Sequence, residues 1–458
     1  TGVNRAHPLL APVFAADDLH SVHPAWGTDD HHGHGSEMSG LAFFGDLTTC
    51  LASTDPLVVN YAGEAVKLLP PDGFPATEPQ SYGLVTQQAI LRPEISRPDR
   101  ARVFCMAVTQ SDVHGPKATS WSATLDAMAF GGDELDDLRQ RLICVSVGNL
   151  PDGLQHSALE DWDDYEIEDP AHAWNVLSVG GYTLKGPITD EGFDHWHCAV
   201  ELGGLSPYSR VSASWYRGVS PIKPELVLEA GNKGIGSFDS SMVSGMDSLS
   251  LLTTSRDPLV HPLTLAWATS AATAQLSGMA TAILADDPDL WPETVRALLT
   301  HSARWTPPME QALLGTGQKS ERLLMLRRFG YGVPSVERAL RSASNSLALV
   351  AQQEIQPFVH DNGRTRLNQA HFFTLPWPTE TLLALGEHEV RLRVSLSYFV
   401  EPNPSADAPI SPARYRSAGL RFDLRRRNEP QDRFEARVNA LASIEEGVAG
   451  LVHVSEFE

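Results

Sequence analysis

The sequence has few cysteines, an excess of acidic over basic residues, and no long apolar run. Its four cysteines are widely spaced in 458 residues and form no CxxC pair, so neither a dense disulfide framework nor a cysteine-ligated zinc site is predicted. The formal net charge of −22 argues against nucleic acid or an anionic membrane as the main partner. No apolar run reaches the length of a membrane span. Low cysteine content slightly favours the cytoplasm. Because the chain starts at Thr1, however, the sequence decides neither whether a signal peptide precedes it nor which compartment the protein occupies.

The first three quarters of the chain alternate short apolar segments with helical patterns. Strands are expected at 64–69, 101–109, 142–147, 173–179 and 225–228, and helices at 82–91, 120–130 and 335–343. Strands that are apolar on both faces are typical of a parallel sheet covered by helices. The pattern therefore predicts an α/β fold with a doubly wound, mostly parallel sheet, whose active residues gather at the carboxyl ends of the strands.

From about residue 345 the pattern changes. Segments 371–375, 389–396 and 420–425 alternate apolar and polar residues, which is the period of half-buried antiparallel strands. Proline-rich loops separate them. We therefore expect a smaller C-terminal β-sandwich over residues 345–458, with an incomplete sandwich as the alternative to a complete one.

One serine, Ser270, is expected at the start of an apolar helix that ends before Asp286-Asp287-Pro288. A backbone N–H at a helix N-terminus has no partner within the helix, and the helix dipole favours negative charge there. Such a serine is well placed to attack a carbonyl and stabilise the resulting oxyanion. The alternative is an ordinary N-cap serine on a buried helix.

Residues 29–42 are expected to form a histidine-rich polar loop that enters another helix, with Met38, Leu41 and Ala42 on its buried face. A metal site would use His31, His32 and His34 with Asp29 or Asp30. The spacing matches no strong metal motif, so we predict no metal and no other cofactor. A single catalytic histidine at the helix entrance is favoured instead, and a solvated loop also accounts for His31 and His32.

Three segments resemble the motifs of the subtilase family of serine proteases. Residues 34–40 resemble its histidine motif, residues 145–149 the strand that delivers its oxyanion asparagine, and residues 268–274 its serine motif. They also occur in the subtilase order. The resemblance covers about residues 1–344, so it implies a subtilase catalytic domain over 1–344, N-terminally truncated, with a C-terminal domain at 345–458.

The resemblance implies a serine endopeptidase that acts on peptides or proteins. His34 would take the proton of Ser270 and later protonate the leaving amine. The side-chain amide of Asn149 would stabilise the oxyanion together with the backbone N–H of Ser270.

It also implies where the substrate binds. Ala107, Val108 and Thr109 would pair with the extended substrate backbone, and Gly148 would lie in the facing wall of the P1 pocket. Strand pairing of this kind recognises backbone more than sequence.

The third member of a subtilase triad is an aspartate in an Asp-Thr-Gly or Asp-Ser-Gly motif. Residues 1–4 resemble the continuation of that motif, so the aspartate is expected immediately before Thr1. We assign none of Asp17, Asp18, Asp29 and Asp30 to the triad. The chain as printed is expected to be a poor enzyme, and the intact protein to have the full triad.

Two departures from the family pattern support other interpretations. Ala268 replaces a glycine, and its methyl group could crowd the substrate or disfavour a positive φ angle. Ala274 replaces a proline. With the absent aspartate, Ala268 supports a second hypothesis, a non-catalytic subtilase-fold module that binds protein.

Other enzyme classes make different predictions. A histidine-bound metallohydrolase would keep chelator-sensitive activity without Ser270. An α/β-hydrolase is disfavoured because no GxSxG motif occurs.

An acidic insertion after Asn149 has three possible explanations. It contains Glu160, Asp161, Asp163, Asp164, Glu166, Glu168 and Asp169. The segment could favour basic substrates or bind calcium, but a solvated loop is the favoured explanation.

Overall fold

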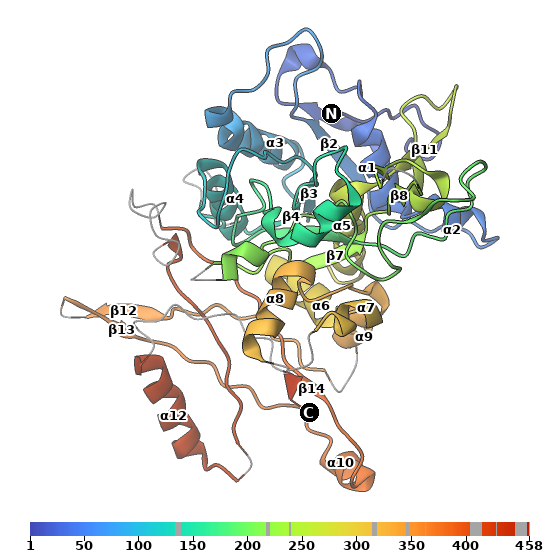
Figure 1. The fold of residues 1–458 in the computed structure, drawn as a ribbon. Helices are drawn as coiled ribbons and strands as arrows, with labels where there is room; N and C mark the ends of the chain where they lie inside the picture. Colours follow the sequence, from blue (N-terminus) through green and yellow to red (C-terminus); the bar gives the residue numbers. More distant parts are fainter. Residues whose placement is uncertain are drawn as a thin grey trace.

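The structure of the chain is a computed structural model. It describes residues 1–458 except 133–138, 217–219, 238–239, 314–317, 345–347, 362, 404–414, 427, 445–455 and 458. Figure 1 shows a main body of sheet and helices, with the C-terminal segments extending below it. In the described part of the chain no helix is both long and apolar enough to cross a membrane.

The centre of the main body is a four-stranded parallel sheet with the order β3-β4-β5-β7. Its strands are β3 (Val103–Met106), β4 (Leu142–Ser146), β5 (Leu177–Tyr182) and β7 (Leu226–Glu229). All three pairings are parallel. The predicted α/β fold with a mostly parallel sheet is therefore confirmed.

Helices cover both faces of this sheet (Figure 1). One face packs against α3 (Tyr82–Ser96) and α4 (Ser120–Phe130). The other packs against α5 (Ala268–Asp286), α6 (Pro292–Ser302) and α9 (Val336–Ser344). Successive residues of β4 enter opposite cores, since Cys144 packs toward α5 and Val145 toward α4. This explains why its sequence is apolar throughout.

Smaller elements surround the sheet. The parallel pair β1 (Phe14–Ser21) and β2 (Gly63–Lys67) lies at the N-terminus, with α1 (His34–Phe44) and α2 (Leu47–Leu51) between the two strands in sequence. A hairpin of β10 (Leu251–Thr254) and β11 (Leu263–Ala266) precedes α5. The remaining elements are β6 (His197–Cys198), β8 (Gly234–Ile235), β9 (Met242–Val243), α7 (Pro307–Gln311), α8 (Lys319–Phe329) and short 3-10 helices at Pro24–Trp26, Pro79–Ser81, His156–Asp164, Ala213–Tyr216 and Asp247–Leu249.

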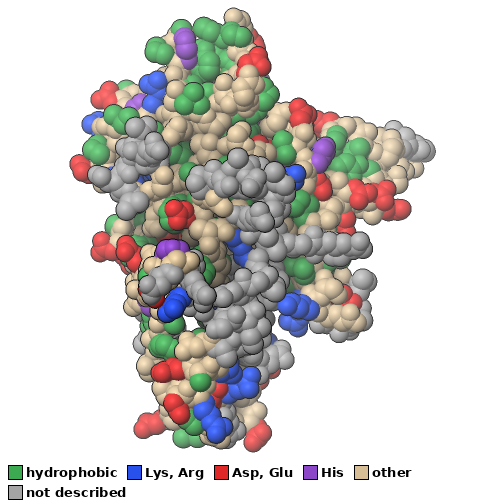
Figure 2. Space-filling model, turned by 90° about the vertical axis from the view of Figure 1, so that its left-hand side faces the viewer, with side chains coloured by type: hydrophobic (Ala, Val, Ile, Leu, Met, Phe, Trp, Pro, Cys, Tyr) green, Lys and Arg blue, Asp and Glu red, His purple; other side chains and the backbone are tan. Residues whose placement is uncertain are grey.

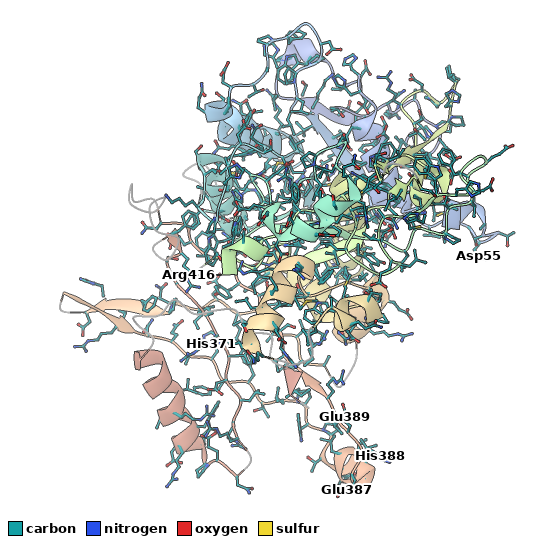
Figure 3. All side chains as sticks on the ribbon, in the orientation of Figure 1. Asp55, His371, Glu387, His388, Glu389 and Arg416 are labelled. Atoms are coloured by element: carbon teal, nitrogen blue, oxygen red, sulfur yellow. The ribbon has the colours of Figure 1, made fainter. Side chains whose placement is uncertain are left out.

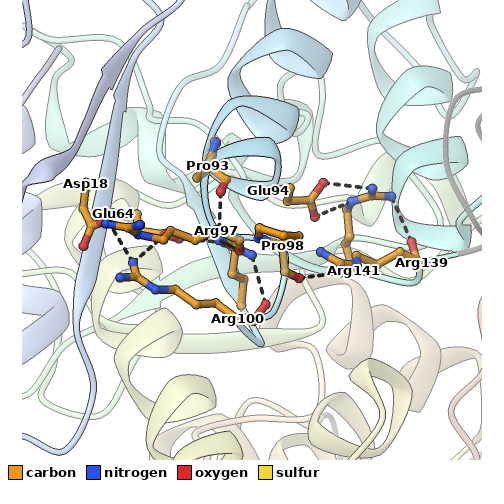
Figure 4. Close-up of polar contacts among 10 residues, drawn as sticks. Asp18, Glu64, Pro93, Glu94, Arg97, Pro98, Arg100, Arg139 and Arg141 are labelled. Carbon is orange, nitrogen blue, oxygen red and sulfur yellow. Dashed lines mark hydrogen bonds and ion pairs between the residues drawn. The ribbon is translucent and has the colours of Figure 1, made fainter.

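Ion pairs fasten the N-terminal pair of strands to α3 and the sheet (Figure 4). Glu64 on β2 binds Arg102 at 2.6 Å and Arg100 at 2.8 Å, and Arg100 also lies 3.0 Å from Asp18. The buried Arg141 donates two hydrogen bonds, of 2.8 and 2.9 Å, to the carboxylate of Glu94 on α3. Asp18 therefore belongs to a network of ion pairs.

The C-terminal region differs from the prediction. Its described elements are β12 (Phe358–Asp361), β13 (Arg364–Leu367), α10 (Thr379–Leu385), β14 (Leu392–Arg393), α12 (Gln431–Ile444) and β15 (Glu456–Phe457). The expected strands at 371–375 and 420–425 are absent from the described residues of those segments, and within 389–396 only Leu392–Arg393 is a strand. The β-sandwich is not confirmed. Phe372 and Phe373 are about half exposed, so the alternation there does not bury one face.

Part of this region is fixed to the main body. Val400 exchanges two backbone hydrogen bonds with the side chain of Asn175, at 2.7 and 2.8 Å. The hydroxyl of Tyr415 donates to Asp126 at 2.7 Å, and Arg416, labelled where the two parts meet in Figure 3, stacks over Trp174. These contacts are made by side chains that are distant in sequence.

Charged side chains are distributed over the face drawn in Figure 2. Basic and acidic groups are interspersed there, and the described basic side chains form no continuous patch in that view.

Candidate active site

Ser270 is the third residue of α5 and is partly exposed. The helix begins at Ala268, whose φ angle is +72°, in the left-handed region. The Ala268 N–H donates to the carbonyl of Ala230 at 2.7 Å, which fixes the entry to the helix beside β7. The predicted apolar helix is confirmed, and its remaining first-turn residues, Thr269 and Ala271, are buried.

His34 is the first residue of α1 and is also partly exposed. The buried Asp30 caps this helix, because its carboxylate accepts from the N–H groups of Gly33 at 2.9 Å and Ser36 at 2.8 Å. Burial opposes ionisation of Asp30, but these hydrogen bonds outweigh it and lower the pKa of its carboxyl group. The carboxylate that the sequence offered as a metal ligand therefore holds the histidine loop.

The two helices that carry His34 and Ser270 pack against each other. A cluster of apolar side chains from α1, from the hairpin and from α5 joins them; it contains Met38, Leu41, Leu251, Ala266, Ala271 and Ala274. Gly278 of α5 lies so close to the carbonyl of Ala42 that a side chain there would collide with it. Thr254 and Thr253 donate to the carbonyls of Ser36 and Glu37, which ties the hairpin to the first turn of α1.

Asn149 lies just beyond the end of β4 and is attached to the residue before Ser270. Its Oδ1 accepts from the backbone N–H of Thr269 at 3.0 Å and from the Thr269 hydroxyl at 2.8 Å. These two hydrogen bonds turn the Oδ1 atom of the amide toward α5. The Nδ2 group therefore points away from Thr269, where it can act as a donor. Sequence reasoning missed Thr269 as the residue that orients Asn149.

The surroundings of His34 favour the neutral imidazole. Burial lowers its pKa, and the positive charge of the nearby Thr1 amino group lowers it further, while Asp30 acts in the opposite direction. The Thr1 hydroxyl accepts from the N–H of Gly35 at 2.8 Å, so the first residue is attached directly to the histidine helix. Within the described residues, the side chains of His34 and Ser270 form no hydrogen bond with each other; such bonds are often long without substrate.

The predicted substrate-binding residues lie at the carboxyl ends of β3 and β4. Ala107, Val108 and Thr109 follow β3 and are partly buried. Gly148 follows β4 with a φ angle of +89° and is buried. The parallel pairing of the two strands brings these segments to the same edge of the sheet.

Glu168 and Arg210 also belong to this neighbourhood and were not predicted as site residues. The Thr109 hydroxyl donates to the Glu168 carboxylate, which forms an ion pair with Arg210 at 3.1 Å. Apolar neighbours of Glu168 in the sequence, such as Ile167 and Ala171, are the signal that could have marked this stretch as buried.

The metal hypothesis gains no support from the geometry. Across the described residues, no three or more histidine, cysteine, aspartate or glutamate side chains are grouped so as to hold an ion. His31 and His32 are exposed, as a solvated loop requires.

Comparison with models of known families finds a match. The model of the subtilase family matches residues 1–332. An uncharacterized protein, y4bN, of Sinorhizobium fredii (strain NBRC 101917 / NGR234) is 27% identical over 356 residues, which cover 74% of this chain and 73% of that protein.

Solved structures of proteases resemble the chain more distantly. A lanthipeptide protease is 15% identical with a TM-score of 0.45, covering 75% of this chain and 85% of its own. The epidermin leader peptide processing serine protease of Staphylococcus aureus is 16% identical with a TM-score of 0.44, covering 75% of this chain and 74% of its own.

Proposed function

Because the chain belongs to the subtilase family of serine proteases, we propose that it is a serine endopeptidase whose nucleophile is Ser270. His34 is the general base and Asn149 the oxyanion donor. The observation that supports this most directly is the anchoring of the Asn149 Oδ1 by Thr269. With Oδ1 held by Thr269, Nδ2 would be the amide group that donates to the oxyanion.

The proposed reaction proceeds in two stages. The Ser270 hydroxyl loses its proton to His34 as its oxygen bonds to the substrate carbonyl carbon. Asn149 and the backbone N–H of Ser270 stabilise the negative oxygen of the intermediate. His34 then gives the proton to the leaving amine, and water releases the acyl group by the same steps in reverse order.

We further propose that an aspartate directly precedes Thr1 and orients His34. The support is electrostatic, since the Thr1 amino nitrogen is close enough to His34 to affect its pKa. A residue bonded to that nitrogen would lie beside the imidazole. A carboxylate there would fix the ring and stabilise the imidazolium form.

The substrate would be an extended peptide. Ala107, Val108 and Thr109 would pair with its backbone on one side, and Gly148 would form part of the P1 pocket on the other. The support is their position at one edge of the sheet, beside Asn149.

A second candidate function is a protein-binding module that has lost catalysis. The φ angle of +72° at Ala268 favours it, because an alanine is strained in the conformation that a glycine adopts without cost.

A fluorophosphonate probe separates the two functions, because it reacts only with an activated serine. The full-length protein with its upstream segment should be labelled, and Ser270→Ala should not. Ser96→Ala, which changes an exposed serine at the end of α3, is the matched control and should stay labelled. Labelling that survives in Ser270→Ala would contradict the assignment of the nucleophile, and no labelling of the unaltered protein would favour the module.

A further inference from the structure

The acidic insertion divides into two parts in the structure. Glu160, Asp161 and Asp164 are exposed, as the solvated-loop interpretation requires. Glu168 and Asp169 are buried, with exposed fractions of 9% and 4%. A solvated loop does not explain a buried carboxylate, so Glu168 needs another explanation.

Glu168 lies between the two segments proposed to hold the substrate. Its backbone N–H donates to the carbonyl of Val147 at 2.9 Å. The next residue, Asp169, pairs with Gln110 through hydrogen bonds of 2.7 and 3.1 Å. The segment is thus fastened on one side to the end of β4 and on the other to the chain that follows β3.

The carboxylate of Glu168 is oriented by three neighbours. Its Oε1 lies 3.1 Å from the Nε of Arg210, whose guanidinium also donates to the carbonyl of Asn149 at 2.8 Å. Its Oε2 accepts from the hydroxyl of Thr109 and lies where a side chain on Gly148 would project. The positive partner is therefore on the Asn149 side, and Oε2 lies between Thr109 and Gly148, which belong to the two segments proposed to hold the substrate.

We propose that Glu168 is the specificity-determining residue of the P1 pocket and that it selects lysine or arginine at P1. This inference rests on the proposed endopeptidase function. A carboxylate that is largely removed from water gains from a second cation, which can use its remaining acceptor sites. An acidic P1 side chain would place like charges together at low local dielectric. Arg210 binds Oε1 and therefore leaves Oε2, beside Thr109 and Gly148, to accept from the P1 side chain.

The test compares peptides that are identical except at P1, which is lysine, glutamine or glutamate. For the full-length protein kcat/KM should be highest for lysine and lowest for glutamate. Glu168→Gln should lower kcat/KM for the lysine peptide by about 10- to 100-fold, the equivalent of one charge-assisted hydrogen bond, and should raise it for the glutamate peptide. Asp161→Asn, which removes an exposed charge from the same insertion, should leave the order unchanged.

Two results would overturn the proposal. One is a preference for glutamine or glutamate over lysine in the unaltered protein, a measurement that does not depend on whether Glu168→Gln folds. The other is a lysine preference that persists in correctly folded Glu168→Gln.

Failure of the proposed function would look different. If no peptide is hydrolysed and Ser270 takes up no fluorophosphonate, the endopeptidase assignment fails. Fluorescence anisotropy then measures how tightly the same peptides bind to Ser270→Ala, and this binding decides whether Glu168 selects a basic P1 residue. Tighter binding of the lysine peptide supports it, and equal binding of the lysine and glutamate peptides overturns it.

Discussion

Ala268 combines a strained backbone with a position two residues before the proposed nucleophile. Its φ angle of +72° is rare for an alanine, and its N–H is bound to Ala230, so the conformation is imposed by the surrounding structure. The sequence predicted a conflict at this position, since the family pattern has glycine here.

Ala268→Gly should stabilise the protein. Relief of the left-handed strain exceeds the entropy that glycine adds to the unfolded chain, which gives a net gain of about 0.5–1 kcal/mol in the free energy of unfolding. Chemical denaturation measures it. Ala274→Gly, in the interior of the same helix, is the matched control and should destabilise by about 1 kcal/mol. A loss of stability in both variants would show that Ala268 is unstrained.

The pKa of His34 offers a second test at the residue scale. In the chain that starts at Thr1, burial and the Thr1 amino charge should place this pKa below 6.5. Because the folded state favours the neutral ring, protonation costs stability, and this loss develops as pH falls below the unfolded value of about 6.5.

Addition of an aspartate before Thr1 removes the positive amino charge that lowers the pKa of His34. It replaces a positive amino group by a peptide bond and a carboxylate, so the pKa of His34 should rise, and the acidic limb of kcat/KM should move to higher pH with it. NMR titration of both forms, with His34→Asn to assign the signal, provides the measurement. An upstream asparagine is the control for the added residue, and an equal pKa with asparagine and aspartate would argue against a carboxylate beside the ring.

The residues proposed to carry chemistry could be predicted only where the motif is local. His34, Asn149 and Ser270 each stand in a short segment with a distinctive order, so sequence alone proposed them. Glu168 and Arg210 meet through the fold, with Glu168 fastened to Val147 and Arg210 to the Asn149 carbonyl. No spacing in the sequence indicates that pairing.

At the scale of elements, the contact between α1 and α5 determines how the histidine and serine helices lie relative to each other. Gly278 permits this contact because a larger residue would collide with the carbonyl of Ala42. Backbone atoms cannot move aside as a flexible side chain can. The two helices would have to separate to accept a methyl group.

Gly278→Ala should therefore reduce both stability and activity. Overpacking of this kind costs about 1–3 kcal/mol, and a small shift of one helix lowers kcat more than it raises KM. Thermal unfolding and peptide kinetics measure the two effects. Thr281→Ala, a partly exposed change one turn further along α5, should have little effect on either. An unchanged kcat in folded Gly278→Ala would show that the spacing of these helices does not affect the site.

Elements were predictable where burial imposes a simple pattern. The strands of the parallel sheet are apolar on both faces, and α3, α4 and α5 pack one side against them, so their segments were recognised. Helix α8 was missed because it is rich in charged residues, and even its buried Arg327 is polar. The C-terminal alternation misled us because its side chains stay largely exposed, as at Phe372.

At the scale of the whole molecule, we retain the division at about residue 344 as a proposal. The main body has its own core on both faces of the sheet. The C-terminal region is attached to it partly through polar contacts, such as those between Asn175 and Val400. Sequence could not predict this attachment, because each partner is an ordinary polar or apolar residue far from the other.

The hydrogen bond between Tyr415 and Asp126 offers a way to test how the C-terminal region is attached to the main body. Burial raises the pKa of Asp126 to about 6, and the hydroxyl of Tyr415 is the first of the hydrogen bonds that oppose this rise. Because the folded pKa is above the ordinary value of 3.8, Asp126 contributes most stability at low pH. That contribution is lost as pH rises from about 4 through 6.

Tyr415→Phe removes one partner of this buried carboxylate and should cost about 1–3 kcal/mol at neutral pH, with a smaller loss below pH 4, where Asp126 is protonated. Denaturation at pH 4 and pH 7 measures the difference. Tyr398→Phe is the control, a partly buried tyrosine of the same region whose hydroxyl donates no hydrogen bond to the described residues. Equal losses at the two pH values would mean that Tyr415 stabilises the attachment through packing alone. A larger loss at neutral pH would identify this hydrogen bond as part of what holds the C-terminal region to the proposed catalytic domain.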